Sequence, residues 1–192
     1  DYKSNYLARI PIIQNVTQAT ASDEKKYYDL KTAFEEANDN DTLKMIADYS
    51  SLPTDETAVN DHIVTFDLNG KVLRQSNNVL IQNTGSLNFT DDSQNADGNL
   101  IFLSGTNVLR NDGTLNIIGG KISTAKADVT LIKNNSGATL NIRDNAKITS
   151  STNTYLIDNS GTTNITNGAY LHTIERNIII NRSILNVIDL NN

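Results

Sequence analysis

The chain has 192 residues, of which 38% are hydrophobic and 20% charged, and its 22 acidic and 16 basic side chains give a formal net charge of −6. This length and composition are typical of one globular domain, and the negative charge, with no cluster of basic residues along the sequence, disfavours nucleic acid as a partner. No apolar run approaches the roughly 20 residues that cross a bilayer, and the absence of cysteine excludes disulfides and thiolate metal sites.

The first 60 residues predict an N-terminal cap region that contains one short α-helix at about 29–37, with flanking strands near 7–13 and 43–47. Asp29 is suited to cap the N-terminus of this helix. We expect the apolar face of the helix to cover one end of the remaining domain, because that face needs a hydrophobic partner. Apolar residues recur at helical spacing at Leu30, Ala33, Phe34 and Ala37.

Residues 61–192 contain a degenerate repeat of an apolar, polar, apolar triplet. Its copies begin at residues 66, 87, 115, 140, 163 and 185, so that one repeat takes 21 to 28 residues. Each repeat has room for three short strands joined by tight turns and no room for a helix, which disfavours leucine-rich and helical solenoids. The sequence therefore predicts an all-β fold, a right-handed parallel β-helix of about six three-strand coils, continuous with the cap as one structural domain.

Asparagines recur in a second register, two residues after an apolar residue of the third strand of each coil. This spacing directs their side chains inward or into the following corner. We expect their amides to hydrogen-bond to one another along the axis and to satisfy the backbone of the corner. These residues are Asn83, Asn111, Asn134, Asn159 and Asn181.

Three stretches of the sequence, residues 28–37, 41–46 and 64–73, resemble the opening of pectate-lyase-like β-helix domains in surface proteins of Gram-positive bacteria, often described as adhesive domains. The resemblance implies a secreted protein located at the cell surface or in the cell wall, with a binding role. It does not imply lyase activity, and no lyase active-site motif maps onto this chain.

The central polar residues of the triplets are the main candidates for ligand binding. They should point outward, because their apolar neighbours point inward, and so form a polar strip on one sheet. Such a strip suits the hydroxyl groups of a glycan, although it could equally keep the sheet surface hydrated. The candidates are Asp67, Asn88, Asn116, Asn141 and Asn164, with Asn186 in the last copy.

Asp91 and Asp92 are further candidates, since they begin a polar insertion at residues 91–99. Part of this insertion is similar to a calcium loop, but it begins with Ser93, and Ser104 stands where an EF-hand has Glu. A solvated turn is the favoured interpretation. We predict no catalytic residue, no metal site and no cofactor.

The leading functional hypothesis is a non-enzymatic binding or adhesin module that recognises a glycan or a host extracellular protein through a side face or a loop. One alternative is a polysaccharide lyase or another carbohydrate-active enzyme. Such an enzyme needs acidic residues and a basic residue on one face. Arg110, Lys133 and Arg143 lie near Asp112, Asp144 and Asp158 in the coil register, but isolated charges on a solenoid surface usually serve solubility. A second alternative is a purely structural stalk.

The last repeat is still strongly apolar at residues 184–190, and no helix or polar segment follows that could act as a lid. Because an open coil exposes backbone groups and core side chains, we expect the chain to be a fragment of a longer surface protein. The alternative expectation is end-to-end self-association through this coil.

Overall fold

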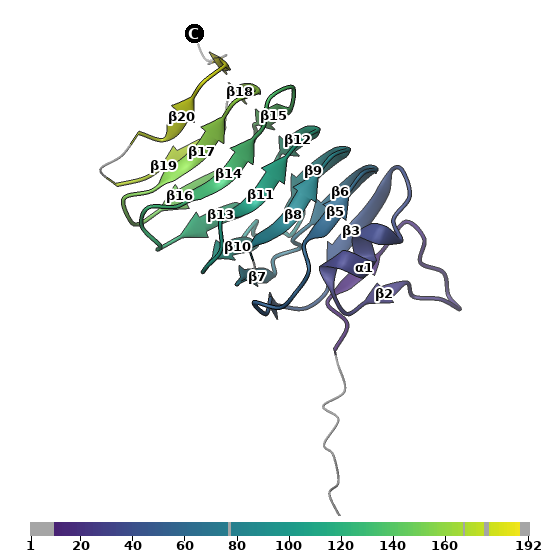
Figure 1. Ribbon diagram of the computed structural model, residues 1–192. Coiled ribbons are helices and arrows are strands. Elements are labelled where there is room, and N and C mark those ends of the chain that lie inside the picture. The colour runs from purple at the N-terminus through teal and green to yellow at the C-terminus, as the bar shows by residue number, and fades with distance from the viewer. Residues whose placement is uncertain (1–9, 77, 167, 175–176, 189–192) are drawn as a thin grey trace, which may run out of the picture.

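The computed structural model describes residues 10–76, 78–166, 168–174 and 177–188 and shows a parallel β-solenoid of about six coils with three strands each (Figure 1). Each coil contributes one strand to each of three sheets, which we call sheets A, B and C. This confirms the predicted fold class. Sheet A has the order β2 (Lys26–Tyr27), β1 (Ile13–Asn15), β3 (Asp41–Met45), β6 (Ile63–Asp67), β9 (Ser86–Thr90), β12 (Thr114–Ile117), β15 (Thr139–Ile142), β18 (Thr162–Thr166) and β21 (Ile184–Ile188).

Sheets B and C each have six strands in the same coil order. Sheet B consists of β19 (Tyr170–His172), β16 (Lys147–Ser150), β13 (Lys121–Thr124), β10 (Asn99–Phe102), β7 (Val72–Gln75) and β4 (Tyr49–Ser50). Sheet C consists of β20 (Ile179–Asn181), β17 (Tyr155–Asn159), β14 (Thr130–Asn134), β11 (Asn107–Asn111), β8 (Val79–Asn83) and β5 (Ala58–Asn60).

The core consists of columns of apolar side chains that stack from coil to coil. In sheet A, Leu115 aligns with Leu140 and Ile117 with Ile142, and all four side chains are fully buried. This confirms the predicted alternation of apolar and polar positions. Ile165, expected in the same column, is only partly buried and pairs with Val187 of the last described strand.

The expected alignment of the first triplet is wrong by two residues. Val64 pairs with Leu87 and Thr65 with Asn88, so that Asp67 faces Thr90 and not an asparagine of the strip. The alternating pattern of β6 continues across both triplet alignments, and sequence spacing alone could not choose between them.

Residues 41–60, which we expected to lie within the cap region, form the first coil through β3, β4 and β5. β3 pairs in parallel with β6, and β5 pairs in parallel with β8. This coil lacks the Leu-Asn-Ile signature of the later ones, so that its sequence gave no repeat signal.

The N-terminal end of the solenoid is covered by β1, β2 and α1 (Leu30–Glu35) (Figure 1). β1 pairs antiparallel with β3 and so extends sheet A beyond the first coil. Asp29 caps α1 as predicted, because its carboxylate accepts the backbone N–H of Thr32 at 2.7 Å. Phe34 is buried among core residues, which confirms the predicted covering role of the helix. Residues 7–9 of the expected first strand lie outside the described residues.

A column of asparagines runs along the corner between sheets C and A, and all of them are buried except Asn181 in the last described coil. Each side-chain amide donates to the side-chain oxygen of the asparagine in the next coil, at 2.7–2.8 Å, which confirms the predicted ladder. Each of the middle members also donates to a backbone carbonyl across the corner, as Asn134 does to Thr162 at 3.0 Å. We call this column the inner ladder; it consists of the five predicted residues and Asn60, which the sequence reasoning missed.

The corner of the inner ladder is short and tightly stacked. Only two residues separate the ladder asparagine from the next strand in the coils of Asn83, Asn111 and Asn159, and the second of them is glycine. A Cβ atom on Gly113 would lie 2.2 Å from the carbonyl oxygen of Gly85, so no larger residue fits there. The corner between sheets A and B, in contrast, accommodates the insertion between β9 and β10.

The last described coil carries exposed apolar side chains on β21, including Ile184, Val187 and Ile188. End-to-end association through this coil stays a prediction, and residues 189–190 of the last repeat lie outside the described residues. In the part of the chain that the structure describes, no helix has the length and apolar character to cross a bilayer.

Candidate functional site

The predicted polar strip forms a continuous row on the outer face of sheet A. Asn116 donates to Asn88 at 2.9 Å, Asn141 to Asn116 at 2.7 Å, and Asn164 to Asn141 at 2.7 Å. Asn186 continues the row by donating to Asn164 at 2.8 Å. We call these five residues the outer ladder; its side chains are partly exposed, in contrast to the inner ladder.

The outer ladder leaves hydrogen-bonding capacity at the surface. Each amide nitrogen carries two N–H groups, and in the described contacts each of Asn116, Asn141 and Asn164 uses one of them, for its neighbour in the preceding coil. The second N–H of each amide therefore remains for water or a ligand. Because neighbouring coils are about 4.8 Å apart, these donors are regularly spaced along the axis.

A row of hydroxyl groups runs beside the outer ladder. It lies two residues earlier on each strand, and hence on the same face of the sheet. Its members are aligned by the parallel pairing of successive strands. They are Ser86, Thr114, Thr139 and Thr162.

Asp67 does not belong to the exposed strip, contrary to the expectation. It is 2% exposed, and its carboxylate accepts the backbone N–H groups of Asn69 at 2.8 Å and Asp92 at 3.0 Å. The Lys44 ammonium lies 3.4 Å from it. Asp67 therefore fixes the turn that follows β6 and the start of the insertion after β9.

Asp91 is also buried, and its side chain stabilises the backbone of the insertion. It is 7% exposed, and its carboxylate accepts backbone N–H groups of Gly70 at 2.8 Å and Gly98 at 2.6 Å, which closes the insertion onto the preceding coil. Asp92 is exposed and accepts the Thr90 hydroxyl at 2.8 Å, at the edge of sheet A. Of the two, Asp92 alone is placed to meet a ligand.

Two of the three basic residues considered for a lyase, Arg110 and Arg143, form ion pairs with nearby acids. Arg110 lies 3.2 Å from Asp112, and Arg143 forms an ion pair with Asp144. Asp158 pairs with Arg182. Within the described ranges, no group of three His, Asp or Glu side chains is arranged to hold a metal ion.

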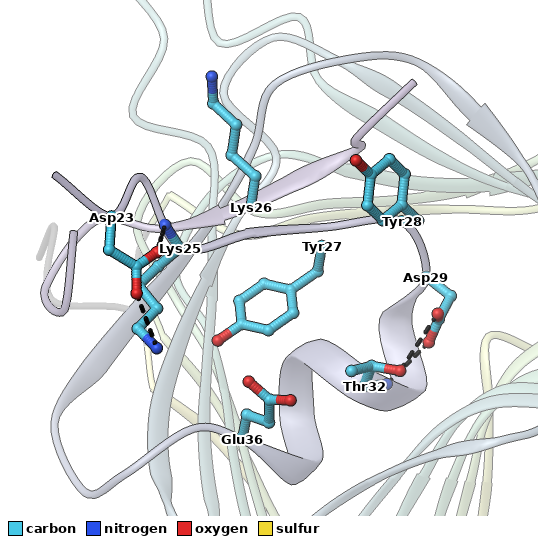
Figure 2. Close-up of a pocket in the computed structure, with 8 residues that line it drawn as sticks. All are labelled: Asp23, Lys25, Lys26, Tyr27, Tyr28, Asp29, Thr32 and Glu36. Carbon is cyan, nitrogen blue, oxygen red and sulfur yellow. Dashed lines mark hydrogen bonds and ion pairs between the residues drawn. The ribbon is translucent and has the colours of Figure 1, made fainter. Parts of the chain in front are cut away.

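A pocket of about 690 Å³ lies apart from the strip, in the N-terminal cap (Figure 2). Tyr27 is 6% exposed, and Figure 2 shows its hydroxyl directed toward the Glu36 carboxylate. The hydroxyl has no hydrogen-bond partner among the described residues. Burial, assisted by the negative charge of Glu36, raises the pKa of Tyr27 to about 12. The pocket is lined by Asp23, Lys25, Lys26, Tyr27, Tyr28, Asp29, Thr32 and Glu36.

The raised pKa of Tyr27 predicts a loss of stability at alkaline pH. An unfolded tyrosine ionises near pH 10, whereas Tyr27 in the fold keeps its proton until about pH 12, so the unfolded state is favoured as pH rises through this interval. Tyr27→Phe should flatten this part of the stability profile, measured by urea unfolding from about pH 9 to 11. An unchanged alkaline loss in the variant would show that Tyr27 titrates normally.

Comparison with protein-family models, with curated proteins and with solved structures finds no match to this chain. The functional argument therefore depends on the geometry of the strip and of the neighbouring faces.

Proposed function

We propose that this chain is a non-enzymatic binding module of a bacterial surface protein, secreted or held in the cell wall, that recognises a glycan through the outer face of sheet A. The outer ladder is the observation that supports this proposal. It presents amide N–H groups beside a row of hydroxyl groups, both repeated from coil to coil. An extended polymer with repeating hydroxyl groups matches such a surface along its length.

The ladder also prepares the amides for binding. The hydrogen bond from Asn141 to Asn116, like those before and after it, holds each side chain in one orientation. Ordering a free side chain at an interface costs about 0.5–1.5 kcal/mol, and much of this cost is absent when the side chain is already fixed.

A double substitution tests the strip. We expect Asn116→Ala with Asn141→Ala to weaken binding about thirtyfold, since two hydrogen bonds of about 1 kcal/mol each are lost. Wild type and variant would be compared on a glycan array that includes neutral polymers and then by titration with the array hits. The matched control is Asn107→Ala with Thr130→Ala on sheet C, which removes two half-buried polar side chains outside both sheet A and sheet B.

Equal binding by the strip variant and the wild type would contradict the proposal. Binding to matrix proteins but to no glycan would favour a host protein as ligand.

Because the strip carries no charged side chain at its ladder positions, its binding should change little with salt concentration.

The lyase alternative is separated from the binding module by one assay. Incubation with an acidic polysaccharide and Ca²⁺ produces unsaturated sugars, and hence ultraviolet absorbance, only if the chain cleaves its ligand. The stalk alternative predicts neither absorbance nor binding.

A further inference from the structure

Among the described residues, most of the basic side chains without an acidic partner lie on one sheet or beside it. Seven of the described lysines and arginines form ion pairs with acids, in the cap, on sheets A and C, and in two turns. Six form none with a described acid, and five of these six lie on sheet B or in the turns next to it. The five are Lys71, Arg74, Lys121, Lys126 and Lys147, whereas the sixth, Lys133, lies on sheet C.

The cations on the outer face of sheet B are arranged in register. Lys121 and Lys147 pair directly in neighbouring strands, and both side chains face outward beside buried Ile122 and Ile148. Like charges opposite one another destabilise a sheet. No acid occupies an outward position of the described strands of sheet B; Asp48, which precedes β4, lies three coils from Lys121 in this register.

Polar and aromatic groups continue the same face. Arg74, Ser123 and Thr149 stand in the adjacent column, two residues further along their strands. At its C-terminal end the rings of Tyr170 and His172 stack at 6.2 Å with an interplanar angle of 3°. Tyr170 is aligned with Lys147 and is 54% exposed, so its ring offers a flat apolar surface next to the charge.

We propose that the outer face of sheet B is a second binding face, specific for an acidic polysaccharide. Lys121, Lys147 and Arg74 contact its anionic groups, Ser123 and Thr149 its hydroxyl groups, and Tyr170 stacks on a sugar ring. A polysaccharide is favoured over a nucleic acid because the net charge of −6 repels a densely charged backbone, whereas a chain with about one charge per sugar meets mainly the local cations. This face is independent of the proposed site on sheet A.

The test compares two double variants with the same change of charge. Lys121→Gln with Lys147→Gln removes the paired cations of sheet B, and Lys25→Gln with Lys26→Gln removes two cations that are already paired with acids in the cap. The probes are a polyuronate, heparin, a glycerol teichoic acid, neutral dextran and a single-stranded oligonucleotide, titrated by calorimetry. The first three differ in their anionic group, carboxylate, sulfate or phosphate, and so identify which source the face prefers.

We expect the wild type to bind at least one of the three acidic polymers more tightly than dextran, with an affinity that falls between about 50 and 200 mM salt. The sheet B variant should lose about tenfold in affinity, and the cap variant should stay within about twofold. Tyr170→Ala should weaken polysaccharide binding at every salt concentration.

Equal losses in the two double variants, equal binding of dextran, or no binding of any acidic polymer would overturn the proposal. Equal or tighter binding of the oligonucleotide would overturn its assignment to polysaccharide. Thermal melting of each variant checks that the fold is retained. Because the sheet A strip is expected to bind independently of salt, failure of one face leaves the other testable.

Discussion

Replacing Phe34 with alanine should lower the free energy of unfolding by about 3–5 kcal/mol. Phe34 is 1% exposed, and its ring centroid lies 5.8 Å from that of Phe66, which lies 6.1 Å from that of Phe89. A helix of six residues such as α1 is not stable alone, so its position depends on this contact. Without the ring, the ends of the apolar columns become accessible to water.

Urea unfolding at constant temperature measures this effect. Tyr28→Ala is the control, because Tyr28 is also an aromatic residue of the cap but is 48% exposed; its loss should be well below that of Phe34. A loss below about 1 kcal/mol for Phe34→Ala would show that the solenoid does not need the helix as a cover.

The second large effect concerns the inner ladder, where Asn134→Ala should cost about 3 kcal/mol or more. Asn134 is fully buried, accepts from Asn111 at 2.8 Å, and donates to Asn159 at 2.8 Å and to the Thr162 carbonyl at 3.0 Å. Its removal leaves one N–H of the Asn111 amide and the Thr162 carbonyl without these partners, while the Asn159 side-chain oxygen keeps the Gly161 N–H. Each unsatisfied buried group costs about 1–3 kcal/mol.

The outer ladder offers a matched control for this substitution. Asn141→Ala also interrupts a ladder between two asparagines, but its partners are partly exposed and can bond to water instead. We expect a loss of at most about 1 kcal/mol. Equal losses for Asn134→Ala and Asn141→Ala in the same unfolding assay would mean that burial does not determine how much a ladder hydrogen bond contributes to the free energy of unfolding.

Much of this fold can be predicted from the sequence because its signals are local and repeated. The triplets at Leu115 and Leu140 fix the inward and outward faces of sheet A, and asparagines at constant spacing indicate the inner ladder. The repeat pattern is no longer recognisable in the sequence where its residues are replaced by other types. Asn60 follows Ala58 and Val59, without a leucine or isoleucine, and so the first coil was missed.

The candidate sites could be predicted only in part, because they depend on which residues share a face. The strip was found because its members occupy one position of the repeat. Lys121 and Lys147 lie in different coils, 26 residues apart in the sequence. Their pairing in neighbouring strands is seen only in the structure. The buried positions of Asp67 and Asp91 follow from an insertion folded back onto the preceding coil, a tertiary contact without a local signature.

The two corners differ in how much additional chain they hold, which matters for grafting foreign peptides onto the protein. In the described coils the corner between sheets C and A holds two residues after Asn111, where a Cβ atom on Gly113 would lie 2.2 Å from the Gly85 carbonyl oxygen, and at most four, after Asn134. Between β9 and β10 the protein already carries additional residues without disturbing the pairing of β10 with β7 and β13. A loop grafted there would be displayed where sheets A and B meet, beside both proposed binding faces.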